Sequence, residues 1–305
     1  MKVLMIFIDG LGMGHKGEEN PYFFARTPFL DSLLGGHIMY KEQGRIVKDN
    51  AALIPTDASL EMPGEPQSAT GQTTLWTGVN AARAVGRHVK AFPTRELREI
   101  IAEHSIMRKL AAAGKRVTSA NAYRDEFFDK TKPGVIRYST STLTILSSGT
   151  PFRNFDDLRK GNAVYQDFTN QLVIEMGYKA TVISPEEAGQ NLARIAAGYD
   201  FTLYEYFQTD KAGHKVDMPR AIKIFEQLDR FIGSCANNTN LDEVLMIITS
   251  DHGNMEDLSI STHTLNPVPT LIIYNRLKEI AWERIISLTD ITPFILDLLG
   301  VDGGK

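Results

Sequence analysis

Cysteine is nearly absent from this sequence. Cys235 is the only cysteine among 305 residues, which excludes an internal disulfide and any metal site built from several thiolates. Metal ligands would therefore have to be histidine and carboxylate side chains. This composition is also compatible with a reducing cytoplasm, where we expect the protein to reside.

Net positive charge and long apolar runs are missing as well. The 33 Lys and Arg residues are outnumbered by 37 Asp and Glu, for a formal net charge of −4, so no basic field exists for nucleic acid or an anionic membrane. No apolar stretch approaches the roughly 18 residues that span a bilayer. The apolar run at the N-terminus is short and lacks the small-residue cleavage pattern of a signal peptide. We expect a soluble protein with no nucleic-acid or membrane partner, and its oligomeric state is left open.

Short apolar runs alternate with amphipathic stretches along the chain. A continuous apolar run bounded by turn residues is typical of a strand buried on both faces of a sheet. Such runs occupy residues 3–8, 201–207, 244–248 and 268–274, and residues 116–122 fit a further strand. Alternation of strands with helices predicts an α/β fold of three layers around a doubly wound, mostly parallel sheet.

The stretches between the strands carry helix start and stop signals, namely a capping residue or proline at the start and glycine at the end. The predicted helices are 28–34, 95–113, 185–197, 219–232 and 289–299. Residues 41–67 are polar and rich in proline, so we predict a loop. Residues 124–180 lack clear periodicity and are predicted to form a small insertion or lid, with an irregular connection as the alternative. The core would then comprise residues 1–123 and 181–305.

Small and hydroxyl residues are concentrated at residues 66–78, which include Ser68, Thr70 and Gly71. The pattern indicates a loop that turns into the N-terminus of a helix. Backbone N–H groups and the helix dipole favour a phosphate or a nucleophilic oxygen at such a turn. A capping segment without chemistry is the alternative interpretation.

Six side chains that can bind metals lie near the ends of the predicted strands. They are Asp9, Asp210, Asp251, His214, His252 and His263. Because the carboxyl ends of parallel strands meet at one edge of a sheet, these groups can converge. Six ligands are too many for one catalytic ion and suit two ions, in an arrangement used for displacement at phosphorus. A dinucleotide site at Asp9-Gly10-Leu11-Gly12 is disfavoured, because the third glycine of that fingerprint is missing.

The sequence resembles the alkaline phosphatase superfamily, and within it the cofactor-independent phosphoglycerate mutases and phosphopentomutases. Five segments in the order of that family carry the resemblance. They are Ile8-Asp9-Gly10, Ser68-Ala69-Thr70-Gly71, Asp210-x-x-x-His214, Ser250-Asp251-His252-Gly253-Asn254 and His263-Thr264-x-Asn266-Pro267-Val268-Pro269.

The resemblance implies an alkaline phosphatase-like fold, two divalent ions, Mn or Zn, and a nucleophilic serine. Asp210, His214 and His263 would hold one ion. Asp9, Asp251, His252 and the Ser68 hydroxyl would hold the other, with Ser68 as the nucleophile that forms a phosphoserine. Thr70 is a second choice, because it lies deeper in the predicted helix. Arg83, Arg87 and Arg124 are candidates for binding the phosphate or carboxylate of a small phosphorylated substrate.

Two departures from the mutase pattern favour a hydrolase. Residues 124–180 leave room for only a small lid, and Gln72 follows Gly71 where the mutases have histidine. We therefore predict a phosphomonoesterase or phosphodiesterase, with a phosphomutase as the alternative and a non-catalytic metal-binding protein as the least favoured one. A sulfatase is set aside, because Cys235 lies outside the required C-x-P-x-R context.

Overall fold

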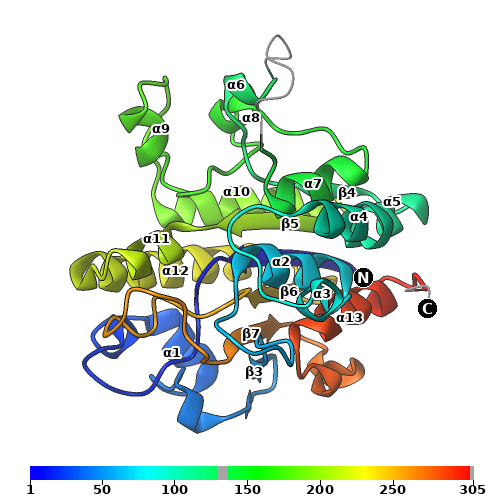
Figure 1. Cartoon of the computed structure of the whole chain (residues 1–305). Helices are drawn as coiled ribbons and strands as arrows, with labels where there is room; N and C mark the ends of the chain where they lie inside the picture. The colour runs from blue at the N-terminus through cyan, green and yellow to red at the C-terminus, as the bar shows by residue number, and fades with distance from the viewer. Residues whose placement is uncertain (129–136, 303–305) are drawn as a thin grey trace.

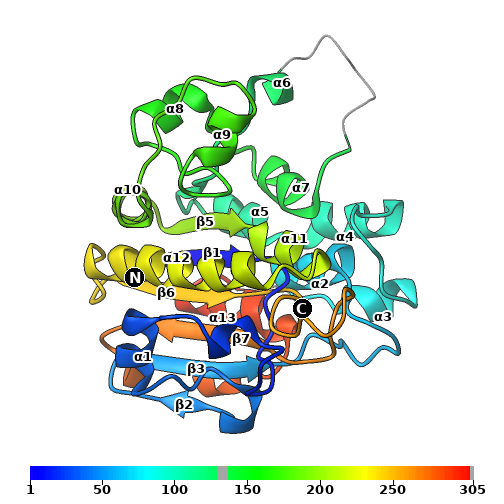
Figure 2. The same cartoon turned by 90° about the vertical axis from the view of Figure 1, so that its left-hand side faces the viewer.

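A central sheet with helices on both faces forms the body of the protein, seen from two sides in Figures 1 and 2. The computed structural model describes residues 1–128 and 137–302. Within these residues the sheet has seven strands, in the order β2-β3-β7-β6-β1-β5-β4. The strands are β1 (Lys2–Ile8), β2 (Ile46–Val47), β3 (Ala51–Thr56), β4 (Val117–Ser119), β5 (Phe201–Tyr206), β6 (Val244–Thr249) and β7 (Val268–Ile273).

The middle of the sheet is parallel. Strand β1 pairs in parallel with both β5 and β6, and β4 extends this block as a parallel neighbour of β5. Strands β7, β3 and β2 then follow with antiparallel pairing. The predicted α/β fold with a mostly parallel sheet is thus confirmed, with a change of direction at β7.

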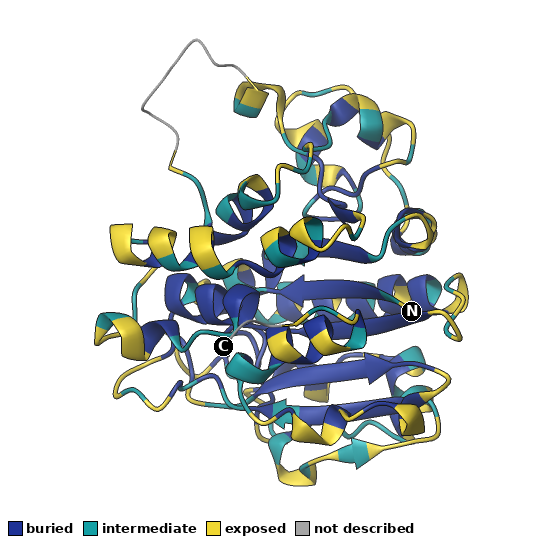
Figure 3. Ribbon diagram, turned by 90° about the vertical axis from the view of Figure 1, so that its right-hand side faces the viewer, coloured by how far each residue is buried: buried dark blue, intermediate teal, exposed yellow. Residues whose placement is uncertain are grey.

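Strand β1 shows why the sheet needs a cover on both faces. Leu4, Ile6 and Ile8 belong to the buried cluster on one face of the sheet. Val3 and Met5 belong to the buried cluster on the opposite face. This alternation follows from the two-residue period of a strand, and Figure 3 shows the sheet buried between more exposed helices. One face is covered by α1 (Pro28–Leu34), α10 (Pro185–Ala197) and α12 (Met218–Asn237), and the other by α2 (Ser68–Thr77), α5 (Ile106–Ala112) and α13 (Ile291–Leu298).

Several element predictions need correction. Residues 41–67 are not all loop, because Ala51–Thr56 form β3, where Pro55 lies opposite Pro269 of β7. Pro55 masked the strand signal, although Ala51 to Ile54 are buried. The predicted helix 95–113 is split into α4 (Arg95–His104) and α5, because Ser105 takes an extended ψ of 130° between them. The predicted strand 116–122 is reduced to β4.

The segment 124–180 contains four short helices in its described part: α6 (Asp125–Phe128), α7 (Thr140–Ser147), α8 (Phe155–Arg159) and α9 (Gln171–Glu175). Helix α7 packs against α2, α4 and α5, while α6, α8 and α9 project beyond the helical layer in Figure 1. Residues 129–136 of the predicted lid lie outside the described residues, and the division into core and lid stays a prediction.

Two further helices are α3 (Ala81–Val85) and α11 (Gln208–His214). No helix among the described residues is both long and apolar enough to cross a membrane.

Candidate metal centre

The three predicted acids lie at one edge of the sheet. Strands β6, β1 and β5 are adjacent and parallel, and Asp251, Asp9 and Asp210 follow their carboxyl ends. In the described part of the chain, two groups of side chains could each hold a metal ion, with ligand atoms within 4.8 Å of one another. One group is Asp9, Asp251 and His252, and the other is Asp210, His214 and His263. The six predicted ligands therefore converge in the two sets of three that the family resemblance implied.

The first group is deeply buried. His252 Nε2 lies 3.3 Å from Asp9 Oδ1 and 3.5 Å from Asp251 Oδ2. Asp251 and His252 have no exposed surface. Short backbone turns after β1 and β6 hold the two acids together, since the Gly10 N–H donates to Asp251 Oδ1 at 3.3 Å.

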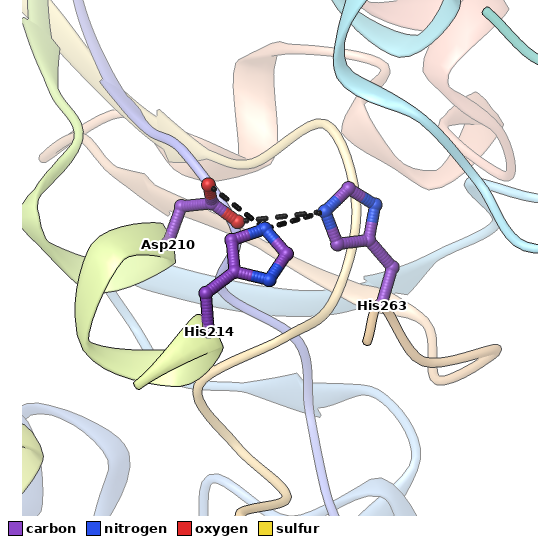
Figure 4. A group of neighbouring side chains, drawn as sticks. All are labelled: Asp210, His214 and His263. Atoms are coloured by element: carbon purple, nitrogen blue, oxygen red, sulfur yellow. Dashed lines mark hydrogen bonds and ion pairs between the residues drawn. The ribbon is translucent and has the colours of Figure 1, made fainter. Parts of the chain in front are cut away.

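The second group is more open to solvent and is shown in Figure 4. Asp210 and His214 are four residues apart on α11, so they project from the same side of that helix. His214 Nε2 lies 3.4 Å from Asp210 Oδ2, and His263 Nε2 lies 3.6 Å from Asp210 Oδ1. Sequence patterns alone gave no helix at 208–214, although this helix sets the spacing of the pair.

The two groups adjoin each other. The rings of His252 and His263 stack with centroids 3.7 Å apart and planes inclined by 14°. His214 Nε2 and His263 Nε2 are 3.3 Å apart. The side chains thus form one continuous centre.

Each histidine of the centre has Nδ1 near a backbone carbonyl oxygen. His214 Nδ1 lies 2.9 Å from Ser261 O, His263 Nδ1 lies 2.7 Å from Pro66 O, and His252 Nδ1 lies 3.3 Å from Gly253 O. A proton on Nδ1 leaves the lone pair of Nε2 pointing into the centre, which is the arrangement found around metal-bound histidines.

The charges of the first group also fit a cation. Burial, followed by the charge of Asp251, raises the pKa of Asp9 to about 7. Burial opposes the charged form of His252, but Asp251 and Asp9 outweigh it and raise its pKa to about 10. Asp9 Oδ1 is buried without a hydrogen-bond partner among the described residues. Two buried acids that both approach His252 Nε2 fit a divalent ion that would replace the proton as counter-charge.

The second group has a carboxylate that stays ionised. Burial alone would raise the pKa of Asp210. A hydrogen bond from His263 and the charge of the nearby His252 outweigh the effect of burial and lower this pKa to about 2. Asn254 Nδ2 donates to Asp210 Oδ1 at 2.7 Å. Asp210 is therefore oriented and charged as a metal ligand needs to be.

Ser68 lies beside the first group. It is the first residue of α2, and its Oγ is 3.0 Å from His252 Nε2. Among the described residues, no side chain caps this helix start. Thr70 is placed differently, since its hydroxyl donates to Gln67 O at 3.1 Å and accepts from the Val89 N–H at 3.2 Å.

A cavity of about 590 Å³, here called the main cavity, opens onto the centre. Asp9, Ser68, Asp210, His214 and His263 line it. Among the described residues that form its wall, the cations other than histidine are Lys90 and Lys211, and none of the three predicted arginines takes part.

The three arginines lie elsewhere. Arg83 is exposed and lies 3.6 Å from Glu61, and Arg87 is exposed. Arg124 lines a neighbouring cavity. Sequence reasoning chose them for their charge alone, and the fold does not bring Arg83 or Arg87 to the cavity.

Gln72 and Glu256 are contacts of the centre that the sequence analysis did not assign. Gln72 Nε2 donates to Asp251 Oδ2 at 3.0 Å. The Glu256 carboxylate accepts from the N–H groups of Gly12 and Asn254 at 2.8 and 2.7 Å and from the Thr264 hydroxyl. Glu256 thus ties together the three loops that carry Asp9, His252 and His263.

Glycines make room for Glu256. A Cβ at Gly12 or Gly253 would overlap Glu256 Oε1. The signal was present in the sequence, since Gly12, Gly253 and Glu256 flank predicted ligands, but only the fold shows that they meet.

The family model of the metalloenzyme superfamily matches residues 1–303. The chain belongs to this superfamily. The resemblance to alkaline phosphatase-like metalloenzymes drawn from five short motifs is therefore confirmed.

Curated relatives of this metalloenzyme are named as 2,3-bisphosphoglycerate-independent phosphoglycerate mutases. The one from Paracoccus denitrificans is 31% identical over 126 residues, which cover 39% of this chain and 24% of the relative. The one from Desulforudis audaxviator is 35% identical over 109 residues, which cover 34% of this chain and 21% of the relative. The chain thus spans about a quarter of the length of these relatives, whose names favour the mutase alternative over the predicted hydrolase.

Solved structures share the fold. A Pyrococcus horikoshii protein gives a TM-score of 0.58 at 20% identity, covering 100% of this chain and 97% of that chain. Phosphoglycerate mutase from Leishmania mexicana, crystallised at low cobalt concentration, gives a TM-score of 0.59 at 11% sequence identity. The match covers 100% of this chain and 96% of that chain. Alkaline phosphatase from the Antarctic bacterium TAB5 gives a TM-score of 0.50 at 12% sequence identity. The match covers 99% of this chain and 98% of that chain.

Proposed function

We propose that this metalloenzyme transfers a phosphoryl group from a small phosphate monoester to Ser68 and then releases it to water. The observation that carries the proposal is the position of Ser68 Oγ. It lies at the start of α2, 3.0 Å from His252 Nε2, in the wall of the main cavity that both ligand groups approach.

The ligand sets support two divalent ions, Mn or Zn. Asp9, Asp251, His252 and Ser68 would hold one ion, and Asp210, His214 and His263 would hold the other. Bound there, the ions would supply a Lewis acid for the phosphate oxygens and lower the pKa of the serine hydroxyl.

The remaining chemistry comes from the chain itself. The start of α2 favours negative charge at Ser68 through the helix dipole. Lys90 and Lys211 supply positive charge on the cavity wall for an anionic substrate. Gln72 and Asn254 orient the acids by hydrogen bonds, so that the centre needs little rearrangement during the reaction.

The acceptor of the phosphoryl group distinguishes two functions. Water is supported by the small size of the segment around α6, α8 and α9, which we propose as the lid, because a mutase must retain its phosphorylated intermediate away from water. Return to an organic acceptor is the second candidate, and the names of the curated relatives favour it.

The test is a panel of mono-, di- and sugar phosphates offered with added Mn²⁺ and Zn²⁺. Release of free phosphate at the rate of substrate consumption supports the hydrolase. A rearranged phosphate ester without free phosphate supports the mutase. Metal uptake without turnover of any compound would leave the non-catalytic metal-binding protein.

The assignment of ligands to ions can be tested separately. Asp251→Asn removes one charge from the first group and leaves the second group unchanged. We expect the metal content of the purified variant to fall from two ions to one, measured by elemental analysis. Loss of both ions, or of neither, would contradict the division into two sets.

A further inference from the structure

A second cavity of about 190 Å³, here called the side cavity, adjoins the main cavity. Ser139, Glu205 and Phe207 line both cavities. A substrate whose phosphate lies at Ser68 can therefore extend its leaving group past Glu205 and into the side cavity.

Glu205 is held firmly at this boundary. It lies in β5, and Asn121 pairs with its backbone twice, donating to the Glu205 carbonyl and accepting from the Glu205 N–H at 2.8 Å each. The Ser141 hydroxyl donates to Glu205 Oε2 at 2.8 Å. Among the described contacts, Glu205 Oε1 has no hydrogen bond, which leaves an acceptor for a bound molecule.

Hydroxyl groups extend from Glu205 along the wall. Ser141 Oγ lies 3.1 Å from Ser139 Oγ, which lies 2.9 Å from Thr142 Oγ1, and Thr142 Oγ1 lies 3.3 Å from Tyr123 Oη. Such neutral groups can donate to and accept from the hydroxyls of a ligand.

The carboxylate of Glu205 is not neutralised by a cation. Among the described residues, no Lys, Arg or His forms an ion pair with it, and burial raises the pKa of Glu205 to about 7, with a further contribution from the charge of Asp9. Arg124 also lines the side cavity, but it is exposed. Above pH 7, where this group is ionised, it repels a second acid and accepts a hydrogen bond from a hydroxyl group.

We propose that Glu205 determines specificity: it accepts a hydrogen bond from a neutral, hydroxyl-bearing leaving group and disfavours a leaving group that carries a carboxylate. This inference rests on the proposed function, since it assumes a phosphate bound at Ser68. It extends that function by defining the charge of the leaving group.

The test compares glycerol 3-phosphate with 3-phosphoglycerate, which differ by a hydroxymethyl group in place of a carboxylate. At pH 8, above the pKa of Glu205, we expect the metal-loaded enzyme to favour glycerol 3-phosphate in kcat/KM by about ten-fold or more. Glu205→Gln, which keeps the shape and removes the charge, should reduce this ratio about ten-fold, mainly by improving turnover of 3-phosphoglycerate.

A matched control is Glu99→Gln on α4. Glu99 is exposed, forms an ion pair with Arg95, and lies outside both cavity walls. The Glu99→Gln substitution removes the same charge from the molecule and should leave the ratio of the two kcat/KM values unchanged. Turnover of p-nitrophenyl phosphate should be the same in the wild type and in the control variant, because Glu99 contacts neither cavity.

The outcomes separate the two proposals. If p-nitrophenyl phosphate is turned over but the enzyme favours 3-phosphoglycerate, or Glu205→Gln leaves the ratio unchanged, the role of Glu205 is wrong while the proposed function stands. If no phosphate ester is turned over, the proposed function is wrong. Calorimetric binding of the two compounds to the wild type and Glu205→Gln then tests the preference without catalysis.

Discussion

His252 joins the two halves of the centre at the scale of single residues. Its ring stacks on His263, and its Nε2 lies near Asp9, Asp251 and Ser68. Because these groups come from the loops after β1 and β6, from α2 and from the loop before β7, a change at one residue can be measured against intact neighbours.

Ser68→Ala should reduce turnover of p-nitrophenyl phosphate by at least about a thousand-fold, because the proposed nucleophile is lost. Most of the bound metal should remain, since six other ligands are unchanged. Activity and elemental analysis on the same sample check both statements.

Thr70→Ser is the control for that variant. It keeps the hydroxyl that bonds to Gln67 and Val89, so activity should stay within a few-fold of the wild type. Full activity of Ser68→Ala would move the nucleophile away from Ser68.

Glu256→Gln should weaken the binding of both ions by about ten-fold or more, because the amide replaces one acceptor oxygen of Glu256 with a donor. Asp229→Asn is the matched control. Asp229 is equally buried and also accepts from two backbone N–H groups, those of Phe29 and Leu30, but lies away from the centre. Both variants should lose stability, and equal loss of metal affinity in the two would contradict a positioning role for Glu256.

Glu205 should make stability depend on pH. Its pKa is raised to about 7 in the folded protein from an ordinary 4.5. Its contribution to the free energy of unfolding is therefore fully present below pH 4.5 and is lost as the pH rises through 7. The free energy of unfolding of Glu205→Gln should therefore rise by on the order of 1–3 kcal/mol relative to that of the wild type between pH 5 and pH 8. Denaturant unfolding of both proteins measures this difference, and a difference that does not change with pH would contradict it.

At the scale of elements, α2 must approach the loop after β6 closely. A Cβ at Gly71 would lie 2.7 Å from the carbonyl oxygen of Asp251 and 3.1 Å from its Cβ. Glycine at this position therefore lets the helix that carries Ser68 pack against the loop that carries the proposed ligands Asp251 and His252.

Gly71→Ala should destabilise the protein by about 1–3 kcal/mol, because the added methyl group displaces the loop from the helix. Metal affinity of the first group should fall with it. Gly149→Ala is a partial control, since a Cβ there meets open space, although its φ of +70° adds backbone strain. Crystal structures of the variants, or metal titrations, would show whether Asp251 has moved.

The elements also show what a sequence can predict. Strands β1, β5 and β6 were predicted because apolar runs buried on both faces have an unmistakable pattern. Strand β3 was missed because Pro55 is usually a loop signal, and α11 was missed because its helix is only seven residues long. Asp210 and His214 were nevertheless chosen as candidate ligands and do lie together on α11, because their spacing matches both a motif and one helical turn.

Contacts between distant loops could not be predicted. Glu256, Gln72 and Glu205 have no distinctive pattern of their own, and their partners lie far away in the sequence. Arg83 and Arg87 lie outside both cavity walls for the converse reason, since charge in a sequence says nothing about which surface a side chain reaches.

At the scale of the whole molecule, the centre lies between elements from both halves of the chain, so metal binding should stabilise the entire fold. Removal of metal with a chelator should lower the thermal midpoint, and added Mn²⁺ or Zn²⁺ should restore it. At a metal concentration a thousand times the Kd, one ion contributes about 4 kcal/mol. An unchanged midpoint by calorimetry would contradict a metal site at these residues.

The central claim is that Ser68 carries the phosphoryl group during turnover. The most direct measurement is mass spectrometry of the metal-loaded enzyme, quenched in acid during turnover of p-nitrophenyl phosphate and digested to peptides. We expect one phosphoryl group on the peptide that contains Ser68 and none in the Ser68→Ala variant. Rapid turnover with no phosphorylated Ser68 at any quench time, or a phosphoryl group on another residue, would contradict it.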